Sequence, residues 1–246
     1  MSADAHHKTA TEASPGRRLT ELGLGLGPLV AAAGTTASWF VLPASYLLLA
    51  LVLYAMLGIV LYRLAPSGPH QGLGPANLVT LARAGLVLAL AASIPYSVAS
   101  SIQGAWWIIA VATMALVMDG FDGQVARRTG SATPFGARFD MELDSFLMLV
   151  LATLVWRSGR VDGWVVLLGL PRYVFFAAGG IWRWLTAPLP ERFRRKAGCV
   201  MQGVALLIAL GPIIPLPLAT VAAATALVLL LCSFLIDVVW LWREAH

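Results

Sequence analysis

The chain alternates long apolar stretches with short polar segments. Residues 22–62, 84–118 and 197–236 contain no Asp, Glu, Lys or Arg. A membrane-spanning helix needs about 20 mostly apolar residues, so each of these stretches holds two helices or most of two. Because a segment in lipid must satisfy its backbone hydrogen bonds internally, the pattern predicts helices.

Proline and glycine residues divide these stretches further, for example at Pro43, Pro95 and Pro212. Such residues interrupt helices and mark turns. They lead to a prediction of about eight spans in an all-α membrane protein. The predicted spans are 23–41, 44–62, 76–97, 104–128, 135–157, 163–185, 197–212 and 217–242.

Composition supports a membrane protein and excludes several other classes. The chain is 59% hydrophobic and only 12% charged, whereas about a quarter of the residues in a soluble domain are charged. Cys199 and Cys232 lie in apolar runs, which fits neither a disulfide framework nor a zinc motif. Residues 1–22 lack the apolar region of a signal peptide and are predicted to form a disordered cytoplasmic tail.

The basic residues predict the orientation. With the N-terminus inside, most Lys and Arg at the span ends fall on the cytoplasmic side, and the outer loops carry only Arg157 and Arg160 beside Asp162. This asymmetry is typical of inner-membrane proteins, so the net charge of +5 does not indicate a nucleic-acid partner. Both termini and the segment 119–144 are predicted to face the cytoplasm.

Four aspartates are the strongest candidates for chemistry. Asp119 and Asp122 share one helical arc, while Asp140 and Asp144 are separated by one turn of the next predicted helix. Two helices joined by a short link would bring the four carboxylates together. Their mutual repulsion requires a cation, and oxygen donors without His or Cys suit Mg²⁺, Mn²⁺ or Ca²⁺.

Neighbouring residues refine this interpretation. Gly123 and Ala126 are small residues on the same arc as the acids, which fits a ligand that approaches the helix, although small residues also serve helix packing. Arg127 is aligned with them. Glu142 points away from the line of acids and is predicted to pair with Arg138.

These residues together resemble the signature of the CDP-alcohol phosphotransferase family. The pattern is Asp119-x2-Asp122-Gly123-x2-Ala126-Arg127-x8-Gly136-x3-Asp140-x3-Asp144, with all eight specified positions present. The resemblance implies a six-helix membrane core over residues 76–246, preceded by an N-terminal transmembrane hairpin at 23–62 and a loop at 63–75. These two additional helices lie outside the resemblance.

The resemblance also implies a reaction. A CDP-linked donor, usually CDP-diacylglycerol in bacteria, passes its phosphatidyl group to an alcohol and CMP is released. Asp119, Asp122 and Asp140 are implied as ligands of Mg²⁺ or Mn²⁺, with two ions expected. Asp144 is implied as the general base and as a further ligand. A homodimer in the bacterial inner membrane, with its site facing the cytoplasm, is expected.

The same resemblance implies donor contacts on three segments. On the predicted fourth span and the link after it, the implied contacts are Gly123, Ala126, Arg127 and Thr133. A looser resemblance covers Pro75 to Arg83, the start of the first core helix. Its implied donor contacts are Asn77, Thr80 and Arg83.

The acceptor alcohol stays open among glycerol phosphate, inositol phosphate, serine and another phospholipid. The candidate acceptor contacts are Arg172, Arg194, Arg195 and Lys196, although basic residues there also suit anchoring to lipid head groups. Arg172 could instead pair with Asp237 in the eighth span. Two other function classes remain: a divalent-cation transporter and a non-catalytic membrane protein with a degenerate site.

Overall fold

The computed structural model describes residues 15–64, 74–129, 133–182, 184 and 193–245. The described residues form helices and no strand. The α-helices are α1 (Pro15–Trp39), α2 (Ala44–Leu64), α3 (Gly74–Ser93), α4 (Ile102–Thr129), α5 (Pro134–Arg157), α6 (Pro171–Ile181), α7 (Phe193–Leu210) and α8 (Leu216–Ala245). Two 3₁₀-helices, η1 (Ser97–Ser100) and η2 (Gly163–Leu168), lie between them.

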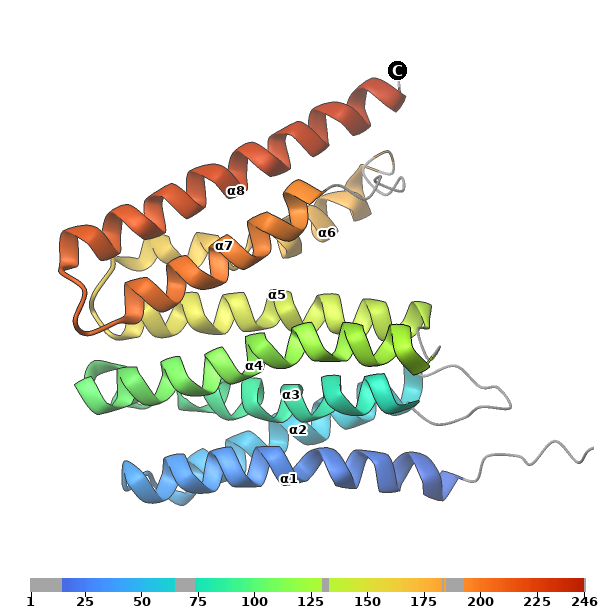
Figure 1. Cartoon of the computed structure of the whole chain (residues 1–246), viewed down its shortest axis with the longest axis vertical. Helices are drawn as coiled ribbons and strands as arrows, with labels where there is room; N and C mark the ends of the chain where they lie inside the picture. The colour runs from blue at the N-terminus through green and yellow to red at the C-terminus, as the bar shows by residue number, and fades with distance from the viewer. Residues whose placement is uncertain (1–14, 65–73, 130–132, 183, 185–192, 246) are drawn as a thin grey trace, which may run out of the picture.

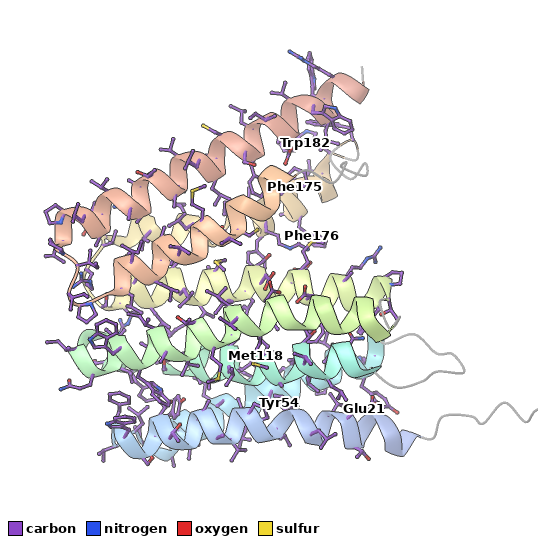
Figure 2. The ribbon with its side chains drawn as sticks, in the orientation of Figure 1. Glu21, Tyr54, Met118, Phe175, Phe176 and Trp182 are labelled. Atoms are coloured by element: carbon purple, nitrogen blue, oxygen red, sulfur yellow. The ribbon has the colours of Figure 1, made fainter. Side chains whose placement is uncertain are left out.

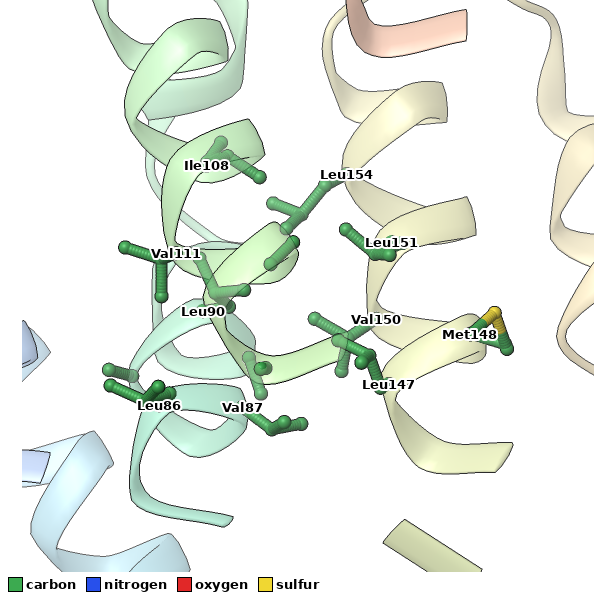
Figure 3. Packing of buried hydrophobic residues seen from close by; sticks show 14 of the residues in the cluster. Leu86, Val87, Leu90, Ile108, Val111, Leu147, Met148, Val150, Leu151 and Leu154 are labelled. Atoms are coloured by element: carbon green, nitrogen blue, oxygen red, sulfur yellow. The ribbon is translucent and has the colours of Figure 1, made fainter. Parts of the chain in front are cut away.

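The helices stack in layers with their axes roughly aligned (Figure 1). The helices α1 and α2 form one side, α3 to α5 form the middle, and α6 to α8 form the other side. The middle layer holds much of the apolar core, where Val87, Ile108 and Leu151 are fully buried (Figure 3).

One end of the middle layer gathers three helix termini. The helices α3 and α5 begin there and α4 ends there (Figure 1). Local sequence explains these boundaries. Thr133 caps the first turn of α5 and Pro134 follows it, an arrangement that helix N-termini favour because proline lacks the N–H that would be unpaired. The predicted acid segment therefore spans the end of α4 and the start of α5.

Three helices are long and apolar enough, by length and composition, to cross a membrane within the described residues. They are Ala44–Leu64, the Ile102–Gly120 part of α4 and Leu216–Arg243. Shorter apolar helical stretches cover Asn77–Ser93 and Gly198–Leu210. The large apolar side chains of Val174 and Phe176 in α6 are exposed, with exposed fractions of 62% and 83%, and Phe176 is labelled in Figure 2. This protein is an integral membrane protein.

Two sequence predictions about the helices were wrong. The span predicted at 163–185 is divided into η2 and an α6 of only 11 residues. Pro171 is the first residue of α6, a position that proline favours because it lacks the backbone N–H that a helix continuing through it would use. At the N-terminus, α1 begins at Pro15, so residues 15–22 of the predicted disordered tail are helical. Glu21, in that segment, is buried.

Candidate active site

A buried arginine lies at the centre of the predicted site. Arg83 comes from α3, and its side chain has no solvent exposure. Its guanidinium forms ion pairs with three aspartates: Asp119 from α4, and Asp140 and Asp144 from α5. One nitrogen, Nη1, bonds to Asp119, while Nη2 lies 2.6 Å from Asp140 Oδ1 and 2.9 Å from Asp144 Oδ1. The arginine therefore joins three helices through its charge.

The three aspartates converge as the helical spacing predicted. One carboxylate oxygen from each of Asp119, Asp140 and Asp144 lies within 4.8 Å of the others. The exposed fractions of these three side chains are 38%, 34% and 31%, respectively. The acids thus have a buried cation on one side and an open side that a polar ligand can reach.

The three aspartates bring several negative charges close together. Each of them pairs with the same guanidinium, and like charges at such distances repel each other. Carboxylate oxygens are the donors that hard divalent cations prefer. The donor set therefore fits a divalent metal, which would complete the neutralisation that Arg83 begins.

The start of α5 is held tightly against α3. The Thr133 hydroxyl accepts a hydrogen bond of 3.0 Å from the Gly136 N–H. A Cβ added at Gly136 would lie 2.3 Å from Asn77 Oδ1, a distance that real Cβ atoms do not adopt. Asn77 is buried. Glycine at position 136 thus allows the two helices to approach each other one turn before Asp140.

A second ion pair lies beside the aspartates. Arg172, at the start of α6, pairs with Glu142 of α5, and Arg172 Nη1 lies 3.0 Å from the sulfur of Met141. Both partners are accessible, with exposed side-chain fractions of 34% for Arg172 and 56% for Glu142. Glu142 is two residues from both Asp140 and Asp144, so this pair links α6 to the acid-bearing turn of α5.

A family model for CDP-alcohol phosphatidyltransferases matches residues 73–239, which is most of the chain. The chain belongs to the CDP-alcohol phosphatidyltransferase family. It is a metal-dependent transferase of phospholipid synthesis, and Asp119 of α4 is clustered with Asp140 and Asp144 of α5. No solved structure matches the chain.

Other residues of the family-like motif lie in α4. Asp122, Gly123, Ala126 and Arg127 are helical, but their side chains lie outside the described part of the structure. The same holds for Arg194, Arg195 and Lys196 in the first turn of α7.

The structure changes the predicted ion-pair partners of Arg172 and Glu142. Arg172 was considered as a partner of Asp237, but its ion pair is with Glu142. Glu142 was expected to pair with Arg138, and that prediction was wrong, because the cation that reaches Glu142 comes from α6. The Thr133 hydroxyl caps α5, and its predicted contact with the donor stays a prediction.

The role of Arg83 as a counter-charge was not predicted from the sequence. Arg127 was the cation predicted to align with the acids, and Arg83 was predicted only as a donor contact. A signal was present, because Arg83 is the one charged residue in the apolar stretch Asn77–Ser93. A charge within an apolar helix generally requires a partner from another helix.

Proposed function

We propose that this enzyme transfers a phosphatidyl group from CDP-diacylglycerol to an acceptor alcohol and releases CMP. The observation that carries the proposal is the convergence of Asp119, Asp140 and Asp144 around a buried arginine between α3, α4 and α5. Membership of the family supports a CDP-linked donor and an alcohol acceptor. Diacylglycerol suits a protein whose site is built from membrane helices.

We infer that the four motif aspartates hold two Mg²⁺ or Mn²⁺ ions. Asp119, Asp140 and Asp144 supply converging oxygen donors, and Asp122 is one turn from Asp119 in the same helix. Bound divalent ions neutralise the charge that develops on the phosphates and on the departing nucleotide.

Asp144 is the proposed general base. Its carboxylate takes the proton of the acceptor hydroxyl as the hydroxyl oxygen forms a bond to the phosphorus of the phosphatidyl group. The bond from that phosphorus to the CMP oxygen breaks, and CMP leaves with both electrons of that bond. Arg83 bonds to Asp144 Oδ1 at 2.9 Å, which orients the carboxylate. A base acts only when it lies within hydrogen-bond reach of the proton.

The donor is proposed to lie between α3 and α4. Asn77, Thr80 and Arg83 occupy α3 near the acids, and all three are buried. On α4 and the link after it, the proposed contacts are Gly123, Ala126, Arg127 and Thr133. Small residues at two of these positions would let the nucleotide approach the helix backbone.

The acceptor is proposed to lie on the α6 side of the aspartates. Arg172 begins α6 and reaches the acid-bearing turn through Glu142. Together with Arg194, Arg195 and Lys196 at the start of α7, it would give a basic site for an acceptor that carries a phosphate. Glycerol phosphate and inositol phosphate have this chemistry, whereas serine does not carry the phosphate.

The proposed membrane arrangement has eight crossings. Residues 23–62 form the N-terminal hairpin, 63–75 a loop and 76–246 the six-helix core, with η2 and α6 together making one crossing. The distribution of Lys and Arg supports a site that faces the cytoplasm of a bacterial cell. A reporter fused at Ser158 should lie outside, and a cytoplasmic reporter would reverse the orientation. Cross-linking in membranes would test the proposed homodimer.

Incubation of the purified enzyme with CDP-diacylglycerol, Mn²⁺ and a panel of alcohols tests the reaction. We expect CMP release with one acceptor and none after chelation. Absence of CMP with every acceptor, together with failure to bind the donor, would overturn the proposal. A transporter would instead carry Mn²⁺ into sealed vesicles without a donor. Asp119, Asp140 and Asp144 converge on one point among the helices, which does not suit an ion path, because such a path needs polar groups at several depths.

A further inference from the structure

We propose that α1, anchored by α2 and α4, positions Arg83 by supporting α3 from the side opposite the aspartates. Such a role would make the additional N-terminal helices part of the catalytic architecture. The proposal rests on the proposed function, which assigns Arg83 and the aspartates to the site.

Two faces of the helix α3 contact different neighbouring helices. Leu81, Gly85 and Ala89 are spaced four residues apart, so they lie along one face. At about 100° per residue, Gly85 is roughly 160° from Arg83 around the helix axis. The face that carries Leu81 and Gly85 contacts α1, while Arg83 extends to α4 and α5.

Two glycines allow the backbones of α1 and α3 to approach closely. A Cβ added at Gly85 would lie 2.8 Å from the backbone nitrogen of Leu29 and 3.3 Å from the carbonyl oxygen of Gly25. A Cβ added at Gly25 would lie 2.3 Å from the Tyr54 hydroxyl and 2.5 Å from Leu81 Cγ. Any larger residue at position 85 therefore meets backbone, which cannot rotate away.

Hydrogen bonds join α1 to α2 and α4, and another joins α2 to α3. The Tyr54 hydroxyl of α2 donates to the carbonyl oxygen of Leu22 at 2.6 Å, and Figure 2 shows Tyr54 beside α1. The indole nitrogen of Trp107 in α4 donates to the Thr36 hydroxyl at 2.8 Å. The hydroxyl of Tyr46, a fully buried residue of α2, donates to the carbonyl oxygen of Ala89 in α3 at 3.1 Å.

This support fixes where Arg83 meets the acids. Hydrogen bonds weaken steeply with distance and angle, so a shift of α3 by about an ångström would break the contacts of Arg83 with Asp140 and Asp144. The carboxylates would then lose the group that holds their oxygens together, while the positive charge would remain nearby. Because metal affinity depends on donors that are held in place, we expect weaker metal binding.

The test compares glycine substitutions in folded, full-length protein, with Mn²⁺ as the probe and its dissociation constant measured by titration calorimetry. We expect Gly85→Ala and Gly25→Ala to raise the dissociation constant at least threefold. The matched control is Gly34→Ala, on α1, since a Cβ there meets nothing within 4 Å. We expect Leu81→Ala, added to Gly25→Ala, to restore part of the binding, because it removes two of the three atoms nearest to the new Cβ and keeps the Tyr54 hydrogen bond to α1.

A dissociation constant within twofold of wild type in folded Gly85→Ala protein would overturn the proposal, even if its melting temperature fell. If Gly85→Ala fails to fold, Gly25→Ala decides in the same way, because its new methyl group meets the buried side chains of Tyr54 and Leu81 instead of backbone and so strains the fold less. Failure of the proposed function looks different: the wild-type protein itself would then bind no Mn²⁺ and release no CMP.

Discussion

Arg83 Nη2 lies 2.6 Å from Asp140 Oδ1, so a charge from the interior of one helix is held by an acid from another. The same nitrogen reaches Asp144, and Nη1 reaches Asp119. Arg83 is fully buried, whereas the acids are partly exposed. This arrangement gives Arg83 a part in stability as well as in the proposed chemistry.

Substitution of Arg83 by Met should destabilise the enzyme. Removal of one partner from a buried ion pair costs about 3–5 kcal/mol, and the partial exposure of the aspartates places the expected loss below that range but above the roughly 1 kcal/mol of a surface pair. Thermal unfolding in detergent with EDTA measures the effect. Mn²⁺ should recover part of the loss, because it neutralises the same carboxylates.

The matched control for Arg83→Met is Arg172→Gln, which breaks an ion pair to the same turn of α5 at a more exposed position. Its melting temperature should change little. Equal falls in the melting temperatures of the two variants would show that buried Arg83 contributes no more to stability than the more exposed Arg172.

Asp144→Asn should abolish turnover while the protein stays folded. An amide cannot accept the proton of the acceptor hydroxyl as a carboxylate does, and loss of a general base typically costs about 10²–10⁴-fold in rate. The measurement is CMP release by purified protein whose fold is verified by gel filtration and helical circular dichroism. Full activity in this variant would exclude Asp144 as the base.

Gly136→Ala should reduce both stability and activity. The new methyl group would collide with Asn77 Oδ1, and overpacking of this kind costs about 1–3 kcal/mol. The rate should fall because the start of α5 carries Asp140 and Asp144. Gly180→Ala, in α6, meets nothing within 4 Å and should change neither the melting temperature nor CMP release by much. A Gly136→Ala protein with wild-type values would show that the two helices can separate freely.

Substitutions at Arg172 and Glu142 should change the KM for the acceptor and leave the KM for the donor unchanged. If Arg172 binds an acceptor phosphate, Arg172→Gln removes a charge-assisted hydrogen bond worth about 1.5–3 kcal/mol, or roughly a 10- to 150-fold rise in the acceptor KM. Glu142→Gln should lower that KM, since it releases Arg172 from its partner. Steady-state kinetics with each substrate varied separately checks both. A change confined to the donor KM would move Arg172 out of the acceptor site.

Helical periodicity was sufficient to predict much of this site. The spacing of Asp140 and Asp144, and the short link between α4 and α5, predicted the convergence that the structure confirms for these acids and Asp119. Proline positions predicted the end of α3 near Ser93. The break before α6 was not predicted, although Pro171 lies there. The residues on both sides of Pro171 are mostly apolar and therefore resemble one continuous span.

Contacts between distant helices could not be predicted in this way. The partner of Glu142 is 30 residues away in the chain, and helical spacing favoured the local Arg138. The close approach of Gly136 to Asn77 likewise depends on how α3 and α5 pack. Periodicity assigns a face to each residue, but it does not indicate which other helix that face meets.

The burial of Arg83 also bears on how the protein is made. A charged residue at the centre of a membrane helix opposes insertion by about 2.5–3.5 kcal/mol, and the apolar stretch around Arg83, Asn77–Ser93, is short. All three aspartates that pair with Arg83 are synthesised later, in α4 and α5. The nascent chain would thus hold α3 against the already inserted α1 and α2 until its counter-charges emerge from the ribosome.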